Sequence, residues 1–120
     1  DFYRGLLGFQ LLGHLDFPDD PRGFSIAYLD TGRGQLELFS FDAAQTQPAG
    51  WQNDDIQLGM RHFALRVTGL DAIAEQLKCA GVPFTIEPMN AVGGVRIAFF
   101  TDPDGILIEL IEGDLTYSRR

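Results

Sequence analysis

The chain has 120 residues, of which 45% are hydrophobic, and a formal net charge of -8 at pH 7. This composition is sufficient for one compact domain with a buried core, and it excludes a disordered chain. The acidic balance excludes the broad basic surface that nucleic acids and anionic membranes need, and no apolar run reaches the ~20 residues that span a bilayer. With one cysteine, Cys79, no internal disulfide can form, so we expect a reducing, cytoplasmic environment.

The first third of the sequence predicts the end of a helix followed by three strands. Residues 2–7 have a helical pattern, and the following segments are rich in apolar and aromatic residues. The strands are predicted at 9–16, 24–30 and 35–41. His14, in the first of these strands, is interpreted as a structural residue.

Residues 42–60 show no periodicity and are rich in Gln, Pro, Asn, Asp and Gly, so we interpret them as a linker. Structureless stretches longer than about 12–15 residues tend to be functional or mobile. Trp51 in this linker is a candidate substrate-binding residue, although an aromatic ring there can equally pack on a partner subunit.

The second half predicts a complete βαβββ module over 61–112, with a polar tail at 113–120. Residues 61–67 alternate as a strand does, Asp71 has the chemistry of a helix N-cap, and Gly81 can end that helix in a left-handed conformation. Three strands follow, with a tight turn at 102–105 between the last two. These strands are predicted at 84–87, 95–101 and 106–112.

The two halves resemble each other. Residues 26–38 nearly recur at 97–110, and the match aligns Glu37 with Glu109. The first copy, 1–41, lacks its opening strand, and the position equivalent to His62 falls about a dozen residues before Asp1. We therefore predict a longer natural chain whose first strand carries that equivalent residue.

Two glutamates and one histidine are the candidate metal ligands. Glu109 lies in a strand that is apolar on both faces, where an unpaired buried carboxylate would cost several kcal/mol, and Glu37 repeats that situation. His62 lies on the polar face of its strand. A divalent cation would satisfy all three side chains. Glu112 is left out, because strand alternation places it on the side opposite Glu109.

Four segments together resemble the glyoxalase, bleomycin-resistance and dioxygenase superfamily. They cover nearly the whole chain, and the last is the most specific: Phe2–Phe9, Leu36–Phe39, Arg61–Val67 and Ala98–Leu110. The resemblance implies an α+β fold in which paired βαβββ modules form a cupped, mostly antiparallel sheet within a single glyoxalase-like domain, residues 1–120.

The resemblance also implies a reaction. Glu37, His62 and Glu109 match metal-ligand positions of the family, with Glu37 and Glu109 as the catalytic acid and base. The cofactor would be a divalent metal (Ni, Zn, Co, Mn or Fe), and the activity that of glyoxalase I, proton transfer through a metal-bound enediolate.

One departure from the family pattern leaves the substrate open. Glutathione-using members have an Asn shortly after the first glutamate, whereas this chain has Phe39-Ser-Phe-Asp42. Arg66 and Arg96 are candidate substrate-binding residues, since guanidinium groups pair with carboxylates, but both can equally be surface charges. The substrate is thus a small oxygenated molecule, with the methylglyoxal–glutathione adduct as one candidate.

Two alternatives stay open: an Fe(II)-dependent ring-cleaving dioxygenase, and a non-catalytic drug-binding protein of the bleomycin-resistance type. The resemblance further implies a homodimer with the site at or near the subunit interface.

Overall fold

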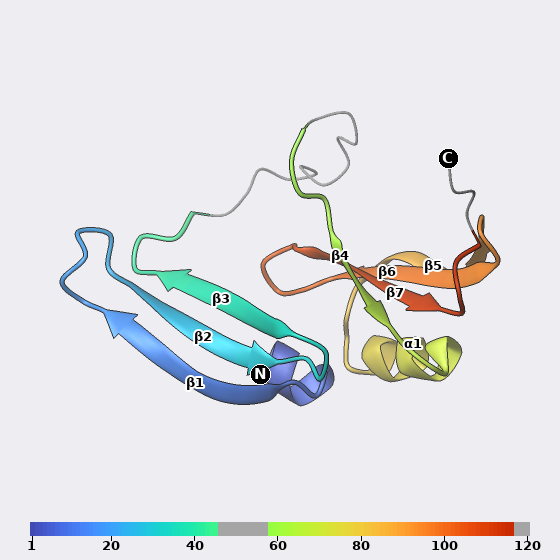
Figure 1. Ribbon diagram of the computed structural model, residues 1–120, viewed down its shortest axis with the longest axis horizontal. Helices are drawn as coiled ribbons and strands as arrows, with labels where there is room; N and C mark the ends of the chain where they lie inside the picture. The colour runs from blue at the N-terminus through green and yellow to red at the C-terminus, as the bar shows by residue number, and fades with distance from the viewer. Residues whose placement is uncertain (46–57, 117–120) are drawn as a thin grey trace. The chain divides into compact units, whose positions relative to one another are not determined.

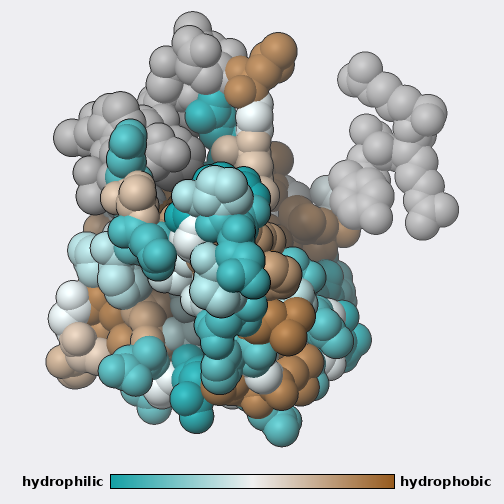
Figure 2. Space-filling model, turned by 90° about the vertical axis from the view of Figure 1, so that its left-hand side faces the viewer, coloured by the Kyte–Doolittle hydropathy of each residue, from teal (hydrophilic) through white to brown (hydrophobic). Residues whose placement is uncertain are grey.

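The computed structural model describes residues 1–45 and 58–116, which divide into two compact units, Asp1–Thr46 and Gln47–Arg120 (Figure 1). The boundary between the units falls inside the predicted linker. Trp51 lies outside the described residues. Within the described parts, no helix is both long and apolar enough to cross a membrane. Hydrophobic side chains reach the surface in the view of Figure 2.

The second unit is a four-stranded sheet with one helix packed on it. The sheet order is β4-β7-β6-β5, with β4 parallel to β7 and the other pairs antiparallel. The helix contacts three of the strands and covers one face of the sheet (Figure 1). The elements of the second unit are β4 (Phe63–Arg66), α1 (Leu70–Cys79), β5 (Phe84–Ala91), β6 (Val95–Thr101) and β7 (Leu107–Glu112).

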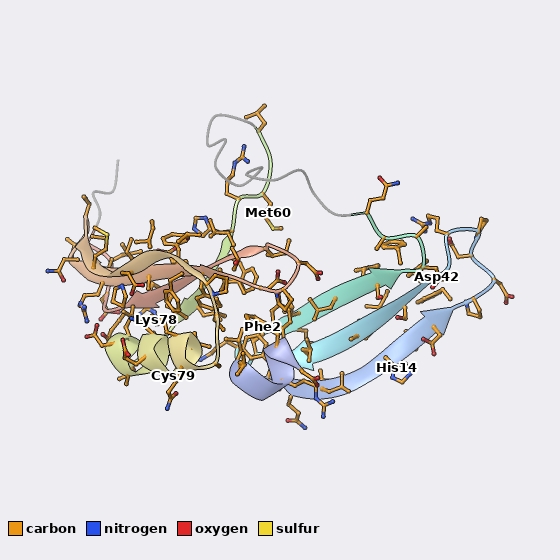
Figure 3. All side chains as sticks on the ribbon, turned by 180° about the vertical axis from the view of Figure 1, so that it is seen from behind. Phe2, His14, Asp42, Met60, Lys78 and Cys79 are labelled. Atoms are coloured by element: carbon orange, nitrogen blue, oxygen red, sulfur yellow. The ribbon has the colours of Figure 1, made fainter. Side chains whose placement is uncertain are left out.

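The core of this unit lies between α1 and the sheet. Alternate residues of β7 point toward the helix, so that Ile108 and Leu110 are buried, and Phe100 of β6 is buried beside them. From the helix, Leu70 and Leu77 meet this layer. Burying each such side chain stabilises the fold by about 1.5–3 kcal/mol. At the end of α1, Lys78 is half-buried and Cys79 is exposed (Figure 3).

The start of α1 differs from the prediction. The N-cap is Gly69, in a left-handed conformation with φ 80°, and not Asp71. The carboxylate of Glu112, at the end of β7, accepts hydrogen bonds from the backbone N–H groups of Gly69 and Leu70. Asp71 instead forms an ion pair with Arg96. A distant strand therefore supplies the cap that was expected from the helix itself.

The turn between β6 and β7 is held by a buried carboxylate. Asp102 Oδ1 accepts hydrogen bonds from the backbone N–H groups of Asp104, at 2.9 Å, and Ile106, at 2.8 Å. Gly105 adopts φ 84°, which a side chain would disfavour. This turn fixes the register of the two strands, with Thr101 opposite Leu107.

The first unit contains the last three strands of the same module and the end of its helix. β1 (Gln10–Phe17), β2 (Phe24–Asp30) and β3 (Gln35–Phe41) form an antiparallel sheet in that order, preceded by the π-helical turn η1 (Phe2–Leu6). β3 is at the edge of this sheet, whereas its equivalent β7 has β4 beside it. The helix tail and strands predicted for this region are confirmed to within about two residues, the usual uncertainty of element ends.

Candidate active site

His62 and Glu109 lie together in the second unit. His62 Nε2 is 3.0 Å from Glu109 Oε2, although 47 residues separate them in the sequence. The parallel pairing of β4 with β7 produces this contact, since it places Ala64 opposite Glu109 and His62 just upstream. Both side chains lie on the face of the sheet opposite α1, because the neighbouring Ile108 and Leu110 are buried beneath the helix.

The surroundings of this pair hold the imidazole in place. The Glu109 side chain is 15% exposed and that of His62 35%. Phe99, the cross-strand partner of Glu109, lies edge-on to the His62 ring, with centroids 5.0 Å apart and an interplanar angle of 79°. A sheltered carboxylate and an oriented ring nitrogen therefore converge from three strand segments.

Glu37 occupies the equivalent place in the first unit. It lies on β3 opposite Tyr28 of β2, with Phe39 two residues along on the same face. The prediction that Glu37 is buried is wrong for this structure, because its residue is exposed. In residues 1–45 the sheet has only the five-residue η1 as helical cover, and β3 has no neighbour on its outer edge.

The donor set of the pair fits a divalent metal. One imidazole nitrogen and one carboxylate oxygen are the ligand types that Zn, Ni, Co, Mn and Fe accept, and their separation of 3.0 Å allows both to reach one ion. Across residues 1–45 and 58–116, no three His, Cys, Asp or Glu side chains form a group that could hold a metal ion. Glu37 belongs to the other compact unit, Asp1–Thr46.

The remaining predicted residues lie in different places. Arg66 shares the face of Glu109, and its Nη1 donates to Asp114 Oδ1 at 2.5 Å. Arg96 lies on the opposite face, where it pairs with Asp71 of α1, so the structure does not bring it to His62 and Glu109.

His14 lies on β1 (Figure 3). It is exposed, with Nε2 3.6 Å from Asp16 Oδ2. Its cross-strand partner is Ala27, the residue before Tyr28, so His14 lies on the face opposite Glu37. Within the first unit, His14 and Glu37 are therefore on different sides of the sheet.

A hollow of about 220 Å³ lies at the far end of the first sheet. Its polar walls are Asp16, Ser25, Ser40 and Asp42, and none of the predicted site residues lines it. It is therefore separate from the predicted site.

Two contributors were missed from the sequence. Phe99 could have been found by counting outward from the predicted turn at 102–105, since the hairpin register pairs it with Glu109. The capping role of Glu112 has no local signal, because its partners Gly69 and Leu70 are more than 40 residues away.

Comparison with known proteins identifies the family of this chain. The model of the Glyoxalase/Bleomycin resistance protein/Dioxygenase superfamily matches residues 1–110. The chain belongs to this superfamily. The predicted family and its paired-module α+β fold are therefore confirmed.

Known members of the superfamily resemble this chain at about one third identity. A lactoylglutathione lyase of Arabidopsis thaliana is 34% identical over 93% of this chain, which spans 38% of that protein. A lactoylglutathione lyase of Pseudomonas aeruginosa is 30% identical over 96% of this chain and 74% of its own length. The crystal structure of glyoxalase I from Zea mays superposes with a TM-score of 0.73, at 31% identity, covering 96% of this chain and 40% of that one.

Proposed function

We propose that this chain is a divalent-metal-dependent lyase or isomerase of the glyoxalase I type. The observation that supports it most is the contact between His62 and Glu109, two side chains of metal-ligand type that come from distant segments and lie on the face of the sheet opposite α1. The repeat adds Glu37 as a second carboxylate at the equivalent position. Relatives called lactoylglutathione lyase support the same chemistry.

In this proposal the side chains have distinct roles. His62 Nε2 and the carboxylates of Glu37 and Glu109 hold the metal, and Phe99 keeps the His62 ring oriented. When bound, the metal would hold the substrate oxygens and stabilise the negative charge that develops on them. One carboxylate accepts a proton from a carbon next to a carbonyl group, and the carboxylate pair returns a proton to the neighbouring carbon. The substrate is isomerised with no atoms gained or lost.

The test is an assay of the metal-loaded full-length protein on the methylglyoxal–glutathione adduct. We expect activity in the unaltered protein, and a loss of about 10²–10⁴-fold in Glu109→Gln and in Glu37→Gln, the range for removing a general acid or base. Glu87→Gln is the matched control, because Glu87 lies on β5 and pairs with Lys78. Unchanged activity in Glu109→Gln would refute the proposed role.

Metal analysis separates this proposal from the two alternatives. About one tightly bound transition metal per site favours an enzyme, and its absence favours a drug-binding protein. Ring cleavage of a catechol by the Fe(II)-loaded protein would favour the dioxygenase.

We also propose that the working protein is a homodimer that completes the site with residues from both subunits. Light scattering at micromolar concentration should give twice the mass of the chain. A monomer with full activity would contradict this arrangement.

A further inference from the structure

Strand pairing places Arg66 on the same face of the second sheet as Glu109, the face opposite α1, which we call the site face. The parallel pairing of β4 with β7 puts Ala64 opposite Glu109. Arg66, two residues further along β4, is therefore the diagonal neighbour of Glu109. A strand rise of about 3.3 Å per residue and a strand spacing of about 4.8 Å put their two Cα atoms about 8 Å apart. The long arginine side chain can span this distance, so its guanidinium is within reach of a ligand held at His62 and Glu109.

Within residues 58–116, the other basic side chains are engaged or lie elsewhere. Lys78 of α1 pairs with two glutamates. Arg96 pairs with Asp71 on the side of the helix. Arg61 precedes β4, and its Nη2 atom is buried. In this part of the chain, Arg66 is thus the cation that a negatively charged group on the site face would meet.

Asp114, in the tail that follows β7, already pairs with this guanidinium. Its Oδ1 accepts a hydrogen bond from Arg66 Nη1 at 2.5 Å, and the side chains of Arg66 and Asp114 are 65% and 93% exposed. Ion pairs this open to water contribute little to stability, because solvent and salt screen the attraction. A carboxylate of a ligand makes the same kind of contact with a guanidinium, so such a ligand competes with Asp114.

The tail that carries Asp114 has other contacts that hold it. Gly113 turns the chain out of β7 with φ 103°, a conformation that favours glycine. The backbone N–H of Thr116 donates to the carbonyl of Gly93 at 2.8 Å. A Cβ atom on Gly93 would lie 3.0 Å from Leu115 Cδ2, so Leu115 lies against the tip of the β5–β6 hairpin. Asp114 is therefore kept in place whether or not the ion pair is formed.

We propose that Asp114 is a built-in competitor that sets the charge preference of the site, and this inference rests on the proposed function. A ligand that chelates the metal and carries a carboxylate near its chelating oxygens has to replace Asp114 on Arg66. A neutral ligand of the same shape leaves the ion pair intact. The preference for an anionic ligand is therefore weaker than Arg66 alone would give.

Two hydroxamates that differ only in charge test the proposal. The monohydroxamate of succinic acid ends in a carboxylate, and its primary amide has the same length and no charge. Calorimetric titration of the Zn-loaded full-length protein gives the affinity for each compound. The readout is the affinity for the carboxylate divided by the affinity for the amide, which we call the charge ratio.

Substitutions at the two partners should move the charge ratio in opposite directions. Asp114→Asn removes the competitor and should raise the ratio about two- to fivefold, the range for an exposed ion pair. Arg66→Gln removes the cation and should lower the ratio by a similar factor, whereas Arg66→Lys should retain part of it. The rise in Asp114→Asn should shrink at about 1 M salt, where the Debye length is about 3 Å.

Two controls separate this competition from a general effect of charge. Asp104→Asn also removes one negative charge from the second unit, but Asp104 is an exposed residue of the turn before β7, at the other end of the strand from the tail. It should leave the charge ratio unchanged. In the Arg66→Gln background, Asp114→Asn should have no further effect, because the two residues act through one contact.

Three results would overturn the inference while leaving the metal site intact. They are an unchanged charge ratio in Asp114→Asn, an equal rise in Asp104→Asn, and a rise in Asp114→Asn that persists without Arg66. A lowered Tm in Asp114→Asn with an unchanged ratio would show that the ion pair serves only to hold the tail. Absence of bound metal refutes the proposed function, and this inference with it.

Discussion

The two units are copies of one supersecondary pattern, yet they differ in how much of the pattern is present. The second unit has β4 and a full helix over the sheet, and most of the buried apolar residues among the described parts belong to it. In residues 1–45 the corresponding strands have η1 as their only helical element, and the buried apolar side chains are Tyr3, Ile26 and Leu29. Alternation in a strand therefore determines the side on which a residue lies, and the neighbouring elements determine whether it is buried.

The two aligned glutamates show the same effect at the site. Glu109 is sheltered beside β4 and contacts His62, whereas Glu37, on an edge strand, is exposed. The same residue at the same place in a repeat thus has a different environment because one neighbouring strand differs.

The largest loss of stability should come from truncating the equivalent core residues of the two copies. Phe100→Ala removes a fully buried ring beneath α1 and should destabilise the protein by about 3–5 kcal/mol. Leu29→Ala, at the equivalent position of the first unit, should cost less, about 2–3 kcal/mol, because the buried side chain that it removes is smaller than the ring of Phe100. Urea unfolding measures both. A larger loss in Leu29→Ala would contradict the comparison.

An intermediate effect should follow from removing the cap of α1. Glu112→Gln weakens an acceptor for the backbone N–H groups of Gly69 and Leu70, and should cost about 1–2 kcal/mol. Ser40→Ala changes the equivalent residue of the first unit, and should alter the free energy of unfolding by less than about 0.5 kcal/mol. Equal losses in the two variants would show that the cap is unimportant.

The smallest effect should come from the ion pair at the start of α1, and it should depend on pH. The hydrogen bond from Arg96 lowers the pKa of Asp71 below its usual value of 3.8. The folded state therefore holds the Asp71 proton less tightly than the unfolded state does, and the pair stabilises the fold above pH 3.8.

This stabilisation should disappear as the pH falls through the lowered pKa. Thermal unfolding should give a slightly higher Tm for the unaltered protein than for Asp71→Asn at pH 7, and equal values in strong acid. If the Tm difference between the unaltered protein and Asp71→Asn instead grew as the pH fell, the ion pair with Arg96 would not be its cause.

Much of the fold could be predicted because its signals are local. The strands at 24–30, 35–41 and 95–101 have the predicted bounds, since alternation and turn residues define them. The start of α1 could not be predicted, because Glu112 supplies the capping carboxylate from another strand. Asp71 has the right chemistry for a cap, but Arg96 engages it instead.

The candidate site, like the fold, could be predicted only in part. Repeat alignment and alternation were enough to select His62 and Glu109, which lie in contact. The exposure of Glu37 depends on the position of β3 at the edge of its sheet in residues 1–45, and the placement of Arg96 depends on the partner that α1 provides. Neither of these is determined by residues nearby in the sequence.

The parallel pairing of β4 with β7 also has a consequence for how the protein folds. After His62 has been synthesised, 47 more residues must follow before Glu109 can lie beside it. Pairings of such large sequence separation form slowly, because the intervening chain must first be ordered. The contact between His62 and Glu109 should therefore appear late in refolding, after α1 and the β6–β7 hairpin, and a nascent chain that ends before β7 should lack it.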